Sequence, residues 1–415
     1  MAKTAKSLFD PEVIKCPYPT YEEMRRERPV AYMPELKAYF VSRYDLVKSI
    51  LSDRRFEKGS AEKDGRKFVV PSDAAKKILL EDAEIGLPIH CLAESAGKIH
   101  MAYRQLADPF VNRKGAAAIQ QIIESYASRL LDTIGKAGEC DVVTEFSSPY
   151  AVSIISDLIG FPESLRPDIK AYADAALTYL TYVTSEEQAV AGAKMMVKMH
   201  GVVRQMAAER RREPKEDILT SLATSTIEGR PLSEKEIVYI TEELVVGGNE
   251  TTANAINNGL LFLAQHPELQ AKLRAQPDQI ASFVEEILRL HPPINSAHRF
   301  TIEDVEIEGV KIPKGTKLYL GTASANRDEA KFACPMDFDP QRKGLVQQLT
   351  FGGGEHFCLG ANLTKMEQIV AYKGWLTRFS SIELAQPVES IEYHNTFASR
   401  APISVKVRVR PATRG

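Results

Sequence analysis

The chain has 415 residues and carries 53 basic and 55 acidic side chains, which gives a net charge of −2. This balance argues against a dedicated nucleic-acid-binding protein, which normally shows a basic excess. Hydrophobic residues make up 44% of the chain, as in ordinary soluble proteins, and no stretch approaches the roughly 18 uninterrupted apolar residues of a membrane span. The five cysteines form no CxxC pair, which favours a reducing compartment. We therefore expect a cytoplasmic protein without membrane or nucleic-acid contacts.

The N-terminal half is predicted to be helical after an initial hairpin. Residues 21–28 have helical spacing, and residues 29–42 alternate around a Pro-Glu turn, which predicts a β-hairpin. From residue 45 to residue 291 most of the chain has helical spacing, except for a loop-like stretch at 88–97. Few strands are therefore expected before residue 291.

One predicted helix is unusually long. Ser233 and Glu236 form a capping box, and no proline follows before Pro267. About 32 residues at 1.5 Å each predict a helix of about 48 Å, long enough to cross a whole domain. A second helix is expected over 278–291, where two prolines end it.

The C-terminal part mixes short strands with one more helix. Alternation over 305–320 predicts strands joined by Gly turns, and the alternating tail at 404–410 predicts a last strand. A Gly-rich loop at 352–354 leads into a helix, and its apolar face is expected to hold Leu363, Met366, Ile369 and Val370. The sequence thus predicts a single domain over 1–415, mainly α with a minor β region.

The segment FGGGEHFCLG places Cys358 after a Gly-rich loop and before a helix. The positive end of a helix favours a thiolate, and free amides there can hydrogen-bond the sulfur. Such a thiolate is either a nucleophile or a metal ligand, whereas a lone cysteine is most often a buried structural residue. A nucleotide-binding loop fails on spacing, and a zinc site would need further ligands although no second cysteine lies nearby.

Taken whole, the segment matches Phe-Gly-x-Gly-x-His-x-Cys-x-Gly at every specified position, from Phe351 through His356 and Cys358 to Gly360. This pattern resembles the haem-thiolate signature of the cytochrome P-450 family. The resemblance implies that family's fold, with a long central helix over haem b (iron protoporphyrin IX) and Cys358 as the iron ligand.

The predicted long helix contains GGNETT at 247–252, which resembles the family's oxygen-activation motif. Gly247 and Gly248 cost about 1 kcal/mol each in a helix, and close helix packing is the simplest explanation for them. The resemblance implies instead a groove for dioxygen over the haem, with Glu250 and Thr251 relaying protons.

Two further sets of residues resemble family elements. Arg299, His356 and the pair His100 and Arg104 match positions that would hold the two haem propionates. The E-x-x-R pair with a downstream arginine resembles the family's structural network, which would keep the cysteine loop in register without taking part in the chemistry: Glu286, Arg289 and Arg342.

The activity implied by the resemblance is that of a monomeric monooxygenase. One atom of O2 would enter a small hydrophobic substrate by hydroxylation or epoxidation, with two electrons from a 2Fe-2S ferredoxin and a flavin reductase that uses NAD(P)H. A basic patch of Lys365, Arg113 and Lys114 would dock the ferredoxin, unless these charges are simply solvated. A peroxide-driven peroxygenase and a non-catalytic haem sensor are alternatives, which the Glu250-Thr251 pair disfavours.

The substrate pocket is placed by analogy on segments that are mostly aliphatic, which suits a small lipophilic molecule such as a terpenoid or an aromatic compound. Its predicted lining residues are Leu87, Ile89, Tyr179, Val245, Val246, Ile294, Asn295 and Phe397.

Overall fold

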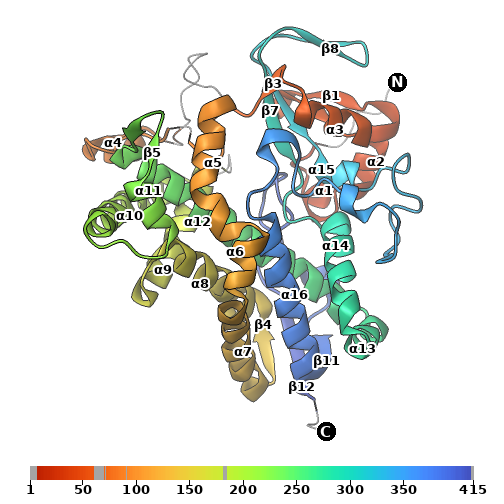
Figure 1. Cartoon of the computed structure of the whole chain (residues 1–415). Coiled ribbons are helices and arrows are strands. Elements are labelled where there is room, and N and C mark those ends of the chain that lie inside the picture. Colours follow the sequence, from red (N-terminus) through yellow and green to blue (C-terminus); the bar gives the residue numbers. More distant parts are fainter. Residues whose placement is uncertain (1–6, 60–69, 71, 90, 181–184, 413–415) are drawn as a thin grey trace.

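The computed structural model describes residues 7–59, 70, 72–89, 91–180 and 185–412, without the side chains of 177–180. Helices form most of it (Figure 1), which confirms the predicted mainly α fold. The helices are α1 Pro11–Lys15, α2 Tyr18–Glu27, α3 Tyr44–Ser52, α4 Asp73–Glu81, α5 Gly97–Val111, α6 Arg113–Ala118, α7 Gln120–Ala137, α8 Ser148–Ile159, α9 Arg166–Leu180, α10 Glu186–Arg212, α11 Ile218–Thr224, α12 Glu234–Ala264, α13 Pro267–Ala275, α14 Ile280–Leu290, α15 Thr322–Ala325 and α16 Ala361–Arg378.

The strands form small sheets, as expected for a minor β region. A mixed five-stranded sheet has the order β1-β2-β10-β7-β3, and a three-stranded antiparallel sheet has the order β11-β12-β4. Two hairpins, β5-β6 and β8-β9, lie outside these sheets. The strands are β1 Val30–Met33, β2 Ala38–Val41, β3 Phe56–Glu57, β4 Glu139–Asp141, β5 Thr226–Ile227, β6 Arg230–Pro231, β7 Ala297–Thr301, β8 Val305–Ile307, β9 Val310–Ile312, β10 Lys317–Leu320, β11 Phe379–Leu384 and β12 Lys406–Pro411.

The predicted N-terminal hairpin is present. β1 and β2 pair antiparallel, with Val30 opposite Val41, and a 3-10 turn at Pro34–Leu36 joins them. Lys37 closes this turn with a φ of 48°, in the left-handed region that lets the chain reverse. The hairpin then joins β10 in parallel, so residues far apart in sequence share one sheet.

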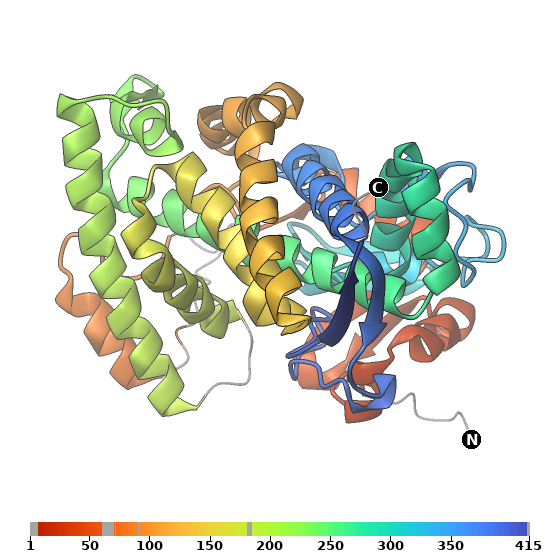
Figure 2. The same cartoon turned by 90° about the horizontal axis from the view of Figure 1, so that it is seen from below.

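The long helix α12 runs through the middle of the molecule in both views (Figures 1 and 2). Its 31 residues agree with the predicted length, and both hydrogen bonds of the Ser233–Glu236 capping box are formed. Helices α8, α9, α10 and α16 contact α12. In both figures α8–α11 lie on one side of the molecule, and the N-terminal helices with the five-stranded sheet lie on the other.

The predicted apolar face of α16 is wrong in its orientation. Of the four residues assigned to it, Leu363 is buried, whereas the other three are only partly buried. The buried face turns instead through polar and aromatic side chains, because these find partners in the core. Tyr372 Oη, for instance, donates a hydrogen bond to the carbonyl of Ala255 on α12 at 2.9 Å. The buried face comprises Ala361, Leu363, Glu367, Gln368, Ala371, Tyr372, Trp375 and Leu376.

Most buried apolar side chains belong to one large core. This core joins residues from Ala75 to Val409 and includes the buried faces of α5, α7–α12, α14 and α16. Two smaller clusters pack around the five-stranded sheet and the N-terminal helices. Among the described helices, none is both long enough and apolar enough to cross a bilayer.

Candidate active site

The cysteine loop is held against α3 by its glycines. Gly354 has a φ of 66°, and a Cβ built there would lie 2.4 Å from the carbonyl oxygen of Leu51, so this position requires glycine. The Cys358 amide N–H donates to the carbonyl of Phe351 at 2.9 Å, which closes the loop. Gly360 then forms the N-cap of α16. The loop therefore delivers Cys358 in a fixed conformation two residues before the cap.

The Cys358 thiol is set deep in the protein but keeps accessible surface. Burial raises the pKa of this thiol, while the Gly360 N–H, which hydrogen-bonds the sulfur, and the charge of Arg104 oppose the shift. A raised pKa does not suit a nucleophilic cysteine, which works as a free thiolate. It does not impede a metal ligand, because a coordinating thiol is deprotonated outright. Cys358 also keeps accessible surface, which argues against the interpretation as a buried structural cysteine.

Basic side chains from α5, β7 and the cysteine loop gather near Cys358. The rings of His100 and His356 lie 4.0 Å apart between centroids, and His100 Nε2 contacts the carbonyl of Glu355 at 3.1 Å. Arg104 lies close enough to Cys358 for its charge to lower the pKa of the thiol, and Arg299 lies close enough to His356 to lower the pKa of the imidazole. The structure thus brings together all four residues that were predicted to hold haem propionates.

The two arginines supply the positive charge of this group. Burial lowers the pKa of His356 to about 2, with His100 and Arg299 adding to the shift, and burial also lowers the pKa of His100. Both imidazoles are therefore neutral hydrogen-bonding groups near pH 7. Burial lowers the pKa of Arg299 only to about 10, so its guanidinium remains charged.

This donor set fits a haem. Arg299 is 3% exposed, and its hydrogen bond among the described residues goes to the neighbouring carbonyl of His298 at 2.8 Å. His100 Nδ1 is buried without a partner in the described chain. A buried cation and an unpaired ring nitrogen beside a single cysteine are what two carboxylates on an iron porphyrin would satisfy.

Sequence reasoning missed a second group beside these residues. Glu94 accepts hydrogen bonds or ion pairs from His298 Nε2 at 3.2 Å and Lys58 Nζ at 3.4 Å. Lys58 and Glu94 also act on the charge of His356. The only indication in the sequence was that Glu94 lies near His100 along the chain and that His298 directly precedes Arg299. Three separate segments meet here, so the contact itself could not be predicted.

The middle of α12 is partly accessible along one face. Residues 236–241 and nearly all of the C-terminal part of α12 are buried, as are Leu244, Val245 and Asn249 between the accessible positions. The accessible positions follow the i, i+3, i+4, i+7, i+8 spacing of one helical face, with Glu242 and Gly248 at its edges. We call this face the α12 stripe: Glu243, Val246, Gly247, Glu250 and Thr251.

The two helix glycines have different roles. A Cβ on Gly248 would lie 2.7 Å from the side chain of Ile155 on α8, so Gly248 allows close helix packing. A Cβ on Gly247 would meet nothing within 4 Å, and Gly247 is exposed on the stripe. Thr251 Oγ1 donates to the Gly247 carbonyl at 2.7 Å. Close packing of α12 against α8 therefore explains the glycine at position 248. The glycine at position 247 leaves the α12 stripe open.

A polar contact ties the stripe to the helix that follows Cys358. Thr252 Oγ1 lies 3.0 Å from Thr364 Oγ1 on α16, and Thr252 also hydrogen-bonds the carboxyl group of Glu367. Burial raises the pKa of Glu367 to about 8, so this carboxyl is protonated at neutral pH. The Thr251 end of the stripe is thereby fixed next to the first turns of α16.

The three residues assigned to a structural network do meet. Both nitrogens of an Arg289 fork contact the Glu286 carboxylate at 2.7 Å, and both side chains are fully buried. Arg342 Nε lies 3.3 Å from the same carboxylate. Arg289 also donates to the carbonyl of Asn326 at 2.9 Å, and Asn326 Nδ2 donates to Thr350 Oγ1 at 2.9 Å. A chain of hydrogen bonds thus connects the network to the residue before the cysteine loop.

The predicted substrate residues are spread over different surroundings. Val246 lies on the stripe, whereas Val245 is 0% exposed and points into the main core. Leu87, Ile89 and Ile294 are partly buried, and the side chain of Tyr179 lies outside the described part of the chain.

The last two predicted substrate residues bind each other. Asn295 Nδ2 donates to the carbonyl of Phe397 at 3.0 Å. The Phe397 ring packs edge-on against Phe9 and Tyr319 in a small N-terminal cluster. Both residues are buried, so their observed contacts are those of a core.

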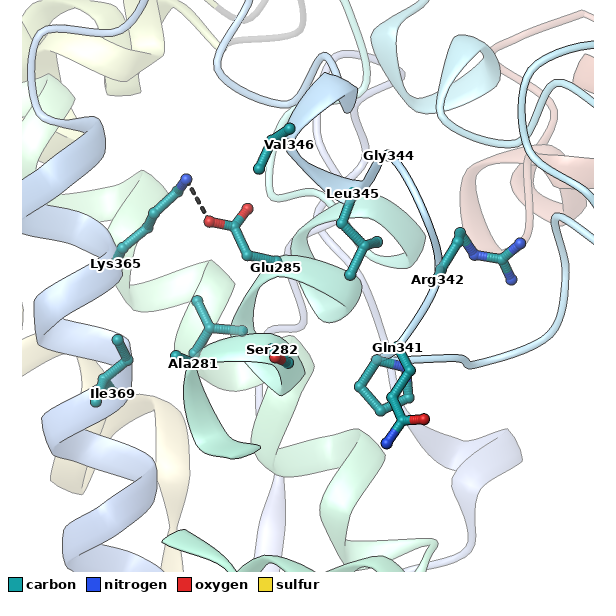
Figure 3. A pocket seen from close by; sticks show the side chains of 12 residues that line it. Ala281, Ser282, Glu285, Gln341, Arg342, Gly344, Leu345, Val346, Lys365 and Ile369 are labelled. Atoms are coloured by element: carbon teal, nitrogen blue, oxygen red, sulfur yellow. Dashed lines mark ion pairs between the residues drawn. The ribbon is translucent and has the colours of Figure 1, made fainter. Parts of the chain in front are cut away.

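A cavity of about 410 Å³ lies between α14, α16 and the loop at 340–346 (Figure 3). It includes Lys365, whose Nζ lies 2.5 Å from Glu285 Oε1 across the opening. None of its lining residues belongs to the α12 stripe or to the cysteine loop. This cavity therefore lies outside the α12 stripe and the cysteine loop, although Lys365 also contacts the Phe351 ring of that loop at 5.3 Å from its centroid.

Comparisons with known proteins agree with this geometry. The family model for cytochrome P-450 matches residues 91–406. The polyketide biosynthesis cytochrome P-450 PksS of Bacillus subtilis strain 168 is 31% identical over 399 residues, which cover 94% of this chain and 95% of the relative. A crystal structure of P-450BioI with acyl carrier protein carrying hexadec-9Z-enoic acid has a TM-score of 0.84 at 28% identity, over 96% of this chain and 99% of that one. CYP109E1 from Bacillus megaterium, in complex with corticosterone, has a TM-score of 0.81 at 25% identity, over 96% and 99%. The chain belongs to the cytochrome P-450 family of oxidoreductases, which use haem b, O2 and electrons that reach them from NAD(P)H through redox partners.

Proposed function

We propose that this protein inserts one atom of O2 into a small hydrophobic substrate, by hydroxylation or epoxidation, with electrons from a 2Fe-2S ferredoxin and its flavin reductase. The observation that carries the proposal is the α12 stripe, on which Glu250 and Thr251 share one accessible face with Gly247. This face is tied to α16, the helix that follows Cys358, through Thr252. A family member without turnover would have no use for an acid and an alcohol on this face.

The haem would be held by residues from three elements. Cys358 Sγ would be the iron ligand, and Arg104 and Arg299 would pair with the propionates, assisted by the neutral imidazoles of His100 and His356. Haem bound through a cysteine thiolate activates dioxygen, because the thiolate pushes electron density toward O–O cleavage. The Gly360 N–H would hydrogen-bond the sulfur and moderate its donation.

The proton supply would come from α12. The Thr251 hydroxyl donates its own proton to the Gly247 carbonyl, so its oxygen lone pairs are free to accept a hydrogen bond on the stripe. Glu250 Oε1 accepts from Asn254 Nδ2 at 3.0 Å, which holds the carboxyl group beside Thr251 on the same helix. Thr251 would position the proton donor, and Glu250 would exchange protons with the surrounding water.

Two features support the substrate class and the electron donor. The names of two similar structures record a long acyl chain and a steroid, and both molecules are largely apolar. On the face that carries α6, Arg113 and Lys114 are exposed, and α6 contacts α16. Lys365 is paired with Glu285, so of the three predicted docking residues Arg113 and Lys114 have the greater free charge. We therefore place ferredoxin docking on α6.

The test is reconstitution with a bacterial 2Fe-2S ferredoxin, its reductase and NADH under ¹⁸O2, using terpenoid, aromatic, fatty acid and steroid substrates. Incorporation of a single ¹⁸O atom into a product supports a monooxygenase. Products that form with hydrogen peroxide but not with the electron chain would show a peroxygenase. Charge reversal at Arg113 and Lys114 should slow ferredoxin-driven turnover and leave substrate binding unchanged, and equal turnover would contradict docking on α6.

A further inference from the structure

The α12 stripe carries one carboxylate that the proposed mechanism does not use. Glu243 lies one turn before Gly247 and two turns before Thr251 on the same face, or about 6 Å and 12 Å along the helix axis. Val246 is the apolar residue between them on the stripe. Glu243 is therefore at the far end of the face on which a substrate would lie against Gly247 and Thr251.

The Glu243 side chain is fixed in place by the backbone of another segment. Its Oε2 accepts a hydrogen bond from the Ala93 N–H at 3.0 Å, and the Leu92 N–H also hydrogen-bonds the carboxylate. These donors belong to the stretch between α4 and α5, which also contains the predicted substrate residues Leu87 and Ile89. Two backbone amides therefore orient the carboxyl group but supply no positive charge to it.

The neighbouring carboxylates have partners of their own. Glu94 pairs with Lys58 and His298, as described above. Glu242 accepts a hydrogen bond from Tyr172 Oη at 3.0 Å. Glu242 also lies 3.7 Å from His200 Nε2, so each of these two carboxylates has a basic side chain within ion-pair distance.

Glu243 differs from both of them. Across the described ranges, no lysine, arginine or histidine forms an ion pair with it. Burial raises the pKa of Glu243 to about 8, and the charges of Glu94 and Glu242 add to this shift. A buried carboxylate without a counter-ion is costly, so Glu243 holds its proton near pH 7, and a bound cation would stabilise the ionised form.

We propose, on the basis of the monooxygenase function above, that the substrate is a lipophilic amine whose cationic nitrogen binds the Glu243 carboxylate. The apolar body of the amine would then lie along Val246 toward Gly247 and Thr251. Glu243 would act as the specificity determinant, because its position fixes which carbon of the body reaches the Thr251 end. The oxidised carbon would be several bonds away from the nitrogen, in keeping with the 6–12 Å between these residues along the helix.

The test compares two probes of the same shape. The cationic probe is 4-phenylbutyltrimethylammonium, which has no lone pair on nitrogen and cannot ligate iron, and the neutral probe is its tert-butyl isostere. Dissociation constants are measured with the haem-loaded protein by calorimetry and by spin-state titration. The wild type should bind the cationic probe about ten- to a hundredfold more tightly, which lies within the range measured for close charge pairs at interfaces. Glu243→Gln should abolish this preference and leave the affinity for the neutral probe unchanged.

Glu242→Gln is the matched control, since it removes a carboxylate one residue away that is bonded to Tyr172. This variant should keep the preference for the cation. Equal binding of both probes by the wild type, or a preference that survives in Glu243→Gln, overturns the inference. The proposed function is judged separately by ¹⁸O incorporation into any substrate: oxygenated products without a charge preference overturn only the amine inference. A charge preference without products from any compound overturns only the function.

Discussion

Two adjacent glutamates on α14 offer a direct test of what holds the cysteine loop. Glu286 is fully buried and bonds Arg289, Arg342 and the Asp339 N–H, the last at 2.9 Å. Glu285, one residue earlier, is partly exposed and pairs with Lys365 at the surface. The same Glu→Gln substitution at the two positions therefore separates a buried network from a surface ion pair on one helix.

The expected costs differ because of burial. In Glu286→Gln, one oxygen keeps its donors, but the new NH2 group faces a guanidinium N–H that stood 2.7 Å from the carboxylate. Two buried guanidinium groups also lose their counter-charge, and removing one partner of a buried ion pair costs about 3–5 kcal/mol. In Glu285→Gln, a solvent-screened pair is lost, and such pairs contribute about 0–1 kcal/mol.

The assay is guanidinium unfolding of both haem-loaded variants, followed by far-UV circular dichroism and by the fluorescence of Trp375, which is the single tryptophan of the chain and is fully buried. Because Arg289 is linked through Asn326 and Thr350 to the cysteine loop, Glu286→Gln should also lose thiolate ligation in the reduced carbon monoxide spectrum. Similar unfolding free energies for the two variants, within about 1 kcal/mol, would refute the reasoning.

Three further outcomes are expected. Thr251→Ala should consume O2 and NADH at a substantial rate while forming several-fold less product, because the hydroxyl that positions the proton donor is gone; coupling equal to the wild type would contradict this role. Arg299→Gln should lower haem affinity about tenfold or more in haem-transfer assays, since the buried cation that we propose pairs with a propionate is lost, and unchanged retention would mean that Arg299 holds no propionate. For Glu367, the folded state keeps its proton up to about pH 8, whereas the unfolded chain releases it near 4.5. Its contribution to stability therefore falls as pH rises through that window. As pH rises from 4.5 to 8, the unfolding free energy of Glu367→Gln should increase relative to that of the wild type. A difference in unfolding free energy that does not change with pH would contradict the raised pKa.

Local patterns predicted much of the fold. The hairpin, the 31-residue α12 with its capping box, α14 and the last strand were all visible in the sequence, because capping, alternation and proline positions act over a few residues. The orientation of α16 was not, since Glu367 and Tyr372 are buried through partners on α12 that lie more than 100 residues away. A pattern of apolar residues cannot show a polar side chain that finds its partner in the core.

The candidate site divides in the same way. The sequence by itself determined the family and predicted the cysteine ligand and the Glu250-Thr251 pair, because these depend on residue types at fixed spacing along one segment. Only the tertiary structure decided that Gly248 serves packing while Gly247 lies on the open stripe, and that Val245 faces the core. It also revealed the surroundings of Glu243, because the sequence does not show that Ala93 and Glu94 from another segment lie beside this side chain. Burial and the lack of a counter-ion are properties of the space around a residue, and that space is made by segments that the sequence does not place side by side.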